Sequence, residues 1–176
     1  GYQLSIDRHL YETIPATDFR KKCFVDFAID GLATPEDKIE ALKAYSDYAD
    51  DVYYSGYGGG PNKTAAVGSK AVGGFSLKFR AAGGAEGHSN QYIGFNCAVP
   101  LMRVEEMQLI EIEAAGMQDE SRGKTLLEAF AKTRDSKFEY GKHHDTYYNQ
   151  STSAFQNEVW WQRRVELWGE GFATFD

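Results

Sequence analysis

Apolar residues in the second half of the chain recur at the spacing of α-helices. After residue 100 they predict a long helix, with the charged residues Glu105, Glu106 and Glu113 largely off its apolar stripe. The stripe consists of Leu101, Val104, Gln108, Ile112 and Ala115, and Met107 and Ile110 widen it. Because apolar side chains lie on more than one side of this helix, we expect it to need packing partners on both sides.

A second helix is predicted from about Ser121 to Arg134, and the segment Gly116 to Glu120 connects it to the first. This segment has the length of a turn between antiparallel helices. The expected buried residues of the second helix are Leu126, Leu127, Phe130 and Ala131. The pair has the pattern of one tetratricopeptide-type repeat, and a solitary repeat cannot bury both of its faces. We therefore expect it to dock on the terminal helix or on further helices of its kind.

The last predicted helix carries all three tryptophans of the chain. Trp161, Val165 and Trp168 follow the i, i+4, i+7 spacing of one helical face, and further apolar residues lie beside it. The pattern indicates a buried scaffold helix that packs over much of its circumference. Gly169 or Gly171 can adopt the left-handed conformation that closes a helix.

The first half of the chain contains fewer regular patterns. Alternation of apolar and polar residues suggests short strands at Lys22 to Ile29 and at Gly74 to Ala81. Between them, Thr34 is a predicted N-cap and Pro35 occupies the first helical position. Glycines then predict a loop over residues 50–74.

Composition and charge limit the possible classes of protein. The chain has 176 residues, 42% of them hydrophobic, which suffices for one core of ordinary size. A net charge of −7 argues against a nucleic-acid partner, because phosphate binding needs clustered Lys and Arg. No apolar run reaches the length of a transmembrane helix. Cys23 and Cys97 are too few for a disulfide framework or a metal site.

Three groups of polar residues partly match functional motifs. Glu105 and Glu106 are adjacent, and neighbours on a helix point about 100° apart, whereas glycoside hydrolysis needs two carboxyls that face one bond. The run His143-His144-Asp145 lacks the spacing of a helical zinc motif. The tripeptide Gly123-Lys124-Thr125 lacks the preceding glycine and strand of a phosphate-binding loop. The sequence therefore predicts no catalytic residues, no cofactor and no metal.

Aromatic residues make up 14% of the chain and include eleven tyrosines. Two clusters lie in predicted loops: Tyr53, Tyr54 and Tyr57 among glycines, and Tyr140, Tyr147 and Tyr148 near His143, Asp145 and Asn149. Tyrosine suits glycan binding because its ring stacks on sugars while its hydroxyl forms hydrogen bonds. The alternative is packing of the rings onto nearby helices, which is the commoner outcome for any single tyrosine. The candidate ligand-binding residues are Tyr53, Tyr54, Tyr57, Tyr147 and Tyr148.

Two segments together resemble the C-terminal signature of the SusD/RagB family. In that family a helix with the pattern R-x-x-E-M-x-L-I-x-A-E-A precedes the motif R-R-x-E-L-W-G-E-G. The stretch from Arg103 to Ala114 is similar to the first pattern, and the stretch from Arg163 to Gly171 is similar to the second. The passage from Asp7 to Lys22 resembles the family's D-x-R and T-D-x-R-K elements, and Lys78-Phe79-Arg80 its K-F strand.

Patterns and resemblance together predict a mainly α protein with a tetratricopeptide-like helix hairpin, a Trp-rich terminal helix, irregular loops and short strands. The resemblance implies an outer-membrane, surface-exposed lipoprotein, lipid-anchored through an N-terminal cysteine absent from this chain. It also implies capture of oligosaccharides or other nutrients for a TonB-dependent, SusC-like transporter, with no catalytic step.

Family members are considerably longer, so we expect this chain to be a C-terminal portion of such a protein. It should form a single region, with residues 1–99 loop-rich and residues 100–176 helical. A rival hypothesis is a protein-interaction scaffold of the helical-repeat type that binds no sugar.

Overall fold

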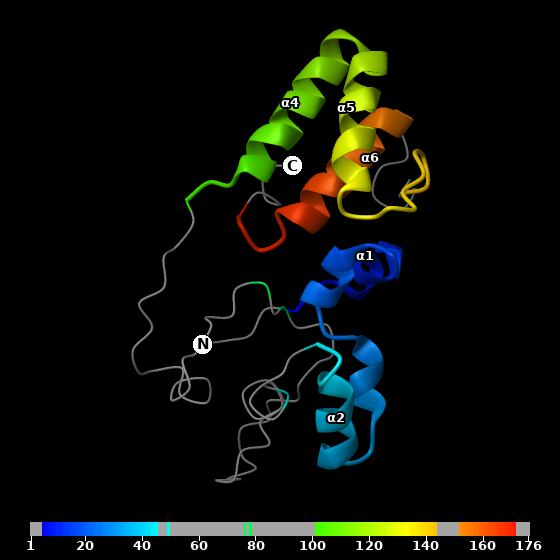
Figure 1. The fold of residues 1–176 in the computed structure, drawn as a ribbon, viewed down its shortest axis with the longest axis vertical. Helices are drawn as coiled ribbons and strands as arrows, with labels where there is room; N and C mark the ends of the chain where they lie inside the picture. The colour runs from blue at the N-terminus through cyan, green and yellow to red at the C-terminus, as the bar shows by residue number, and fades with distance from the viewer. Residues whose placement is uncertain are drawn as a thin grey trace. The chain divides into compact units, whose positions relative to one another are not determined.

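The computed structural model describes residues 5–45, 49, 76, 78, 101–143 and 152–171. The described residues are mainly α-helical, as the sequence predicted (Figure 1). The chain divides into two compact units. One comprises residues 1–11 and 22–99, and the other comprises residues 12–21 and 100–176. Each unit is described by itself below.

The first unit is built from short helical segments around a small apolar core. The 3-10 helix η2 spans Phe27–Gly31 and helix α2 spans Pro35–Leu42, while helix α1, Arg8–Thr13, has its first four residues in this unit and its last two in the other. The core contains Val25, Ile29, Leu42 and Ala49, with Ile39, Ala41 and Tyr45 packed against it. The predicted helix start is confirmed, because the backbone N–H of Asp37 donates to Thr34 Oγ1 at 3.1 Å and Pro35 opens the helix.

The strand predicted from Lys22 to Ile29 is wrong. Two 3-10 helices, η1 at Phe19–Cys23 and η2 at Phe27–Gly31, occupy most of this stretch. The cause is local, because Asp26 caps η2 by accepting a hydrogen bond from the N–H of Ala28 at 2.7 Å. An isolated antiparallel bridge joins Phe24 to Ser76, and Lys78 lies in a turn. The other residues of the strand predicted at 74–81 lie outside the described ones.

The second unit contains a helix hairpin and a third helix that crosses it. Helix α4 spans Val104–Gln118, α5 spans Glu120–Lys132, and α6 spans Ala154–Glu166. Figure 1 shows α4 and α5 side by side and antiparallel, and both contact α6. The predicted docking of the hairpin on the terminal helix is thus confirmed. The connection is shorter than predicted, because α4 continues through Gln118 and Asp119 alone separates the two helices.

Asp119 makes this tight connection possible. Its carboxylate accepts hydrogen bonds from the N–H groups of Ser121 and Arg122 at 3.0 and 3.3 Å, so one residue both ends α4 and caps α5. Two glycines then allow the helices to approach closely. A Cβ atom at Gly116 would overlap the ring of Phe155, and one at Gly123 would lie 2.6 Å from the backbone nitrogen of Gly116. Neither position has room for a side chain.

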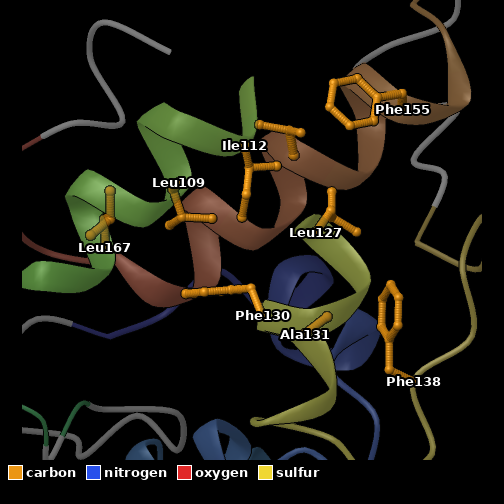
Figure 2. Packing of buried hydrophobic residues seen from close by; sticks show 9 residues of the cluster. Leu109, Ile112, Leu127, Phe130, Ala131, Phe138, Phe155 and Leu167 are labelled. Carbon is orange, nitrogen blue, oxygen red and sulfur yellow. The ribbon is translucent and has the colours of Figure 1, made fainter. Parts of the chain in front are cut away.

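The core of the second unit lies between the three helices. Figure 2 shows side chains from α4, α5 and α6 converging on it, with Leu109 and Leu127 fully buried. Its buried members are Leu109, Ile112, Leu127, Phe130, Ala131, Phe138, Phe155, Val159 and Leu167. Of the residues predicted to be buried on α5, Leu127, Phe130 and Ala131 are confirmed, whereas Leu126 is half-buried.

The buried face of α4 agrees with the predicted stripe at Ile112 and Ala115 and differs from it elsewhere. Glu106, Leu109, Ile112 and Ala115 are the buried residues, whereas the predicted members Leu101 and Val104 are exposed. The physical reason is that apolar side chains surround this helix, so its periodicity alone did not select one face. The predicted two-sided apolar character is confirmed. Six apolar residues at and beside the helix remain exposed, namely Leu101, Met102, Val104, Met107, Ile110 and Met117.

The terminal helix is a scaffold helix, as predicted. Trp161 and Val165 are almost fully buried. Trp168 is half-buried and lies in the turn after α6, so its predicted place on the helix is wrong. Four polar side chains, those of Asn157, Glu158, Gln162 and Glu166, are buried as well. Gly169 and Gly171, which follow the helix, have φ angles of 75° and 92°, so the predicted left-handed conformation is confirmed. Within the part that the structure describes, no helix is both long and apolar enough to cross a membrane.

Candidate functional site

The candidate ligand-binding residues, Tyr53, Tyr54, Tyr57, Tyr147 and Tyr148, lie outside the described residues. Two other residues of the second aromatic cluster, Tyr140 and His143, are described. They show how the segment after α5 is held, because His143 contacts Glu158 and Trp161 of α6. Both are packed against the protein interior.

Tyr140 is half-buried against the core of the second unit. The ammonium group of Lys124 lies 4.3 Å from the centroid of its ring, within the range of a cation–π contact. Burial raises the pKa of the phenol, and the negative charges of Glu120, Glu158 and Glu128 raise it further. Tyr140 therefore follows the alternative of local packing.

His143 lies between two aromatic rings. Its imidazole stacks on Trp161 with a centroid distance of 3.8 Å, and Phe138 lies parallel to it at 5.6 Å. Glu158 binds both its backbone N–H and its ring Nδ1, each at 3.0 Å. Trp161 in turn donates its indole N–H to Thr13 Oγ1 at 2.8 Å. His143 thus fastens the segment after α5 to α6, and the described residues contain no group of three side chains suited to a metal ion.

A cluster of seven charged side chains joins the ends of the helices in the second unit. We call it the charge network, and it consists of Asp18, Arg20, Arg103, Glu105, Arg134, Glu166 and Glu170. Glu166, at the end of α6, is its centre. The Glu166 carboxylate accepts from Arg103 Nη1 at 3.1 Å, Arg20 Nη1 at 3.2 Å and Arg134 Nε at 3.3 Å.

Arg20 holds the start of η1 against α6. Its guanidinium donates to both oxygens of Asp18, with Nη2 at 2.6 Å from Oδ2, and also reaches Glu166. Asp18, Arg20 and Glu166 are all buried. The backbone N–H of Phe19 adds a bond to the carbonyl of Arg134 at 3.2 Å. Since a charge is costly to bury without a partner, this segment is held in place by the pairing itself.

Arg103 closes the other side of the charge network, just before α4. Its guanidinium contacts Glu105, Glu166 and Glu170, the last through Nη2 at 2.8 Å. Nη2 also donates to the backbone carbonyl of Glu166 at 2.8 Å, which satisfies a carbonyl in the last turn of α6. Burial alone would lower the pKa of Arg103, but its bonds to Glu170 and Glu166 outweigh burial and raise it.

The electrostatics of the charge network keep its central carboxylate ionised. Burial alone would raise the pKa of Glu166, but the charges of Arg20 and Arg134, with hydrogen bonds from Arg134 and Arg103, bring it below its usual range. Such a group does not serve as a general acid. Glu105 is paired with Arg103 and Arg134. Glu106, which was predicted to lie off the apolar stripe, is buried on α4, so that prediction is wrong.

Local patterns in the sequence do not reveal the charge network, because its members lie far apart along the chain. The resemblance to the SusD/RagB family did point to these residues. Asp18 and Arg20 lie in the T-D-x-R-K element, Arg103 opens the R-x-x-E-M pattern, and Glu166 and Glu170 are the two acids of E-L-W-G-E-G. The structure brings residues of these three motifs into mutual contact.

A helix hairpin joined to a terminal helix by partly buried ion pairs defines this part of the chain as a helical scaffold. The chain belongs to the SusD family, the SusD/RagB family of the sequence resemblance, whose model matches residues 11–176. Members of this family are nutrient- and glycan-binding proteins associated with the outer membrane, and the family is one of binding proteins rather than enzymes. No curated protein and no solved structure matches the chain.

Proposed function

We propose that this chain is part of an outer-membrane component that captures oligosaccharides for a TonB-dependent, SusC-like transporter. The observation that carries the proposal is membership of the SusD family over residues 11–176. The charge network supports it, because the residues that carry the family motifs build a rigid scaffold. The charged groups of this network are engaged with one another, which suits capture without catalysis. In this proposal the whole protein is a lipid-anchored protein of the cell surface.

The sugar contacts in this proposal come from Tyr53, Tyr54, Tyr57, Tyr147 and Tyr148. His143 supports the choice of the second cluster, since its bonds to Glu158 and its stacking on Trp161 fix a residue shortly before Tyr147 in the chain. Binding residues commonly lie on loops that a rigid element positions. Affinity would come from ring stacking and a few hydrogen bonds, and we expect dissociation constants on the order of micromolar to millimolar.

The test is native electrophoresis of this protein in gels that contain one neutral polysaccharide each. We expect retardation in at least one gel relative to a gel without polysaccharide. Calorimetric titration of single Tyr→Ala and Tyr→Phe variants then assigns the residues. Replacement of a stacked tyrosine by alanine should weaken the binding free energy by about 0.5–1.5 kcal/mol, and replacement by phenylalanine should weaken it less. Unchanged affinity in all five alanine variants would remove both loops from the site.

The second candidate function is a protein-interaction scaffold, and the exposed apolar residues along α4 favour it. Six apolar side chains on α4 or just before it are exposed, among them Leu101 at 95% and Met117 at 70%, and exposed apolar surface of this kind is typical of protein–protein contact sites. Retardation by no polysaccharide, together with loss of self-association or partner binding on Val104→Ser or Ile110→Ser substitution, would favour the scaffold. Release of reducing sugar from any of the polysaccharides would instead indicate an enzyme.

A further inference from the structure

A small groove lies between the second half of α4 and helix α6. Its volume is about 190 Å³, and both helices contribute side chains to it. The lining includes Glu113 and Met117 from α4, and Gln156, Val159, Trp160 and Arg163 from α6. None of these residues belongs to the charge network or to the tyrosine clusters, so the groove is a separate feature of the unit.

The groove is electrically balanced. Its two charged residues are of opposite sign, and Arg163 Nη1 lies 3.7 Å from Glu113 Oε2. This separation exceeds that of a hydrogen bond, so the pair is a loose one. The side chain of Glu113 is half exposed, which leaves its carboxylate accessible to a ligand hydroxyl. A neutral molecule with hydroxyl groups fits these charges better than an anion or a cation does.

The aromatic part of the lining is Trp160, which is half-buried. The guanidinium of Arg164 lies 4.4 Å from the centroid of the Trp160 ring, a cation–π contact that restricts how the indole can turn. Gln156 is fixed too, because its side-chain oxygen accepts the N–H of Ser153 at 3.1 Å in a capping box. The wall of the groove is therefore preorganised by contacts within α6, which lowers the entropic cost of binding.

From this combination we propose that the groove binds one ring of a neutral sugar chain, with the ring against Trp160 and its hydroxyls at Glu113 and Arg163. The volume decides the size of the ligand, since sites for drug-sized molecules occupy about 300–1,000 Å³ and this one is smaller. An aromatic surface beside planar polar groups is the chemistry that recognises sugar rings. This inference rests on the proposed function and adds a sugar subsite outside the tyrosine loops.

The experiment uses the whole chain labelled with 5-fluorotryptophan. The three tryptophans give three fluorine signals, which are assigned by single Trp→Phe variants. The probes are maltotetraose, cellotetraose, xylotetraose and mannotetraose, each titrated to millimolar concentration. We expect the Trp160 signal to shift with at least one probe, while the signal of the buried Trp161 remains in place. Glu113→Gln should weaken this binding roughly three- to tenfold, because a neutral amide replaces the charged acceptor and the hydrogen bond becomes an ordinary one.

Glu111→Gln is the matched control, because Glu111 is an exposed carboxylate on the same helix that does not line the groove. It should leave the titration unchanged. If the protein is retarded in polysaccharide gels but no probe moves the Trp160 signal, the groove is not a sugar site and the proposed function stands. If Glu113→Gln and Glu111→Gln behave alike, the assignment of Glu113 is overturned. Absence of both retardation and signal shifts would overturn this inference and the proposed function together.

Discussion

Replacement of Glu166 by glutamine tests whether the charge network holds the second unit together. Glutamine has nearly the same shape as glutamate but carries no charge, and one of its two terminal atoms is a donor. In the structure both carboxylate oxygens of Glu166 accept from guanidinium groups. The amide oxygen of the introduced side chain could accept hydrogen bonds from Arg20 and Arg134. Its NH₂ group would then face Arg103, and no hydrogen bond could form there because both groups are donors.

The expected loss of stability follows from burial and from the remaining partners. Removal of one member of a buried ion pair typically costs about 3–5 kcal/mol. Asp18, Glu105 and Glu170 continue to pair with the three arginines, so no guanidinium is left without a carboxylate. We therefore expect the lower end of this range, about 3 kcal/mol, for Glu166→Gln at neutral pH. Glu111→Gln, which changes an exposed carboxylate on α4, should alter stability by less than about 0.5 kcal/mol.

The same variant should change how stability depends on pH. The pKa of Glu166 is lowered in the folded protein, so its contribution is present above the pKa of the unfolded chain, about 4.3 for a glutamate. This contribution is lost as the pH falls through the folded-state value. The parent should therefore lose more stability than Glu166→Gln between about pH 6 and pH 3.

The assay is urea denaturation, followed by tryptophan fluorescence, at several pH values. Because Trp161 is stacked on His143 in the second unit, fluorescence reports on this unit directly. If Glu166→Gln unfolds at the same urea concentration as Glu111→Gln near neutral pH, the charge network does not hold the second unit together. If the parent and Glu166→Gln lose the same amount of stability at acid pH, Glu166 is not the source of the pH dependence.

Three further substitutions test the packing. Gly123→Ala should destabilise the second unit by about 2 kcal/mol or more in thermal melts, because the new Cβ meets the backbone of Gly116. Gly31→Ala is the control and should be nearly neutral, because a Cβ at Gly31 would have no atom within 4 Å. Trp161→Ala should cost about 3–5 kcal/mol in urea denaturation, and a midpoint equal to that of the parent would show that the ring is not core. Gln162→Met should raise the unfolding free energy by about 1 kcal/mol, because both amide atoms of this fully buried side chain find no hydrogen-bond partner among the described residues. A lower melting temperature for that variant would mean that the amide is satisfied.

The helices were predictable from the sequence where one local signal dominated. Thr34 and Pro35 marked the start of α2, and the apolar set of α5 was nearly complete, because both follow from residues within one or two turns. Helix α4 was placed correctly, but only Ile112 and Ala115 of its predicted stripe lie on the buried face. Its neighbours select that face, and the sequence of α4 contains no information about them.

The charge network could not be predicted from local sequence patterns either, and the cause is similar. Arg20 and Glu166 are separated by 146 positions, and Arg103 and Glu170 by 67. No periodicity links residues at such distances, and an isolated Arg or Glu reads as a surface charge. Only the family motifs indicated that these residues matter. The tyrosine clusters remain predictions, since Tyr53 and Tyr147 and their neighbours lie outside the described residues.

The exposed apolar side of α4 has a consequence for the redox chemistry of the chain. All three methionines, Met102, Met107 and Met117, lie on this helix or just before it, and their exposed fractions are 63%, 47% and 70%. Peroxide should convert each to a sulfoxide without opening a cavity, because none of them fills the core. The reaction would replace thioethers by polar groups on the surface alone. The protein should therefore keep its melting temperature after oxidation, and any molecule that covers α4 should slow the formation of sulfoxide at these residues.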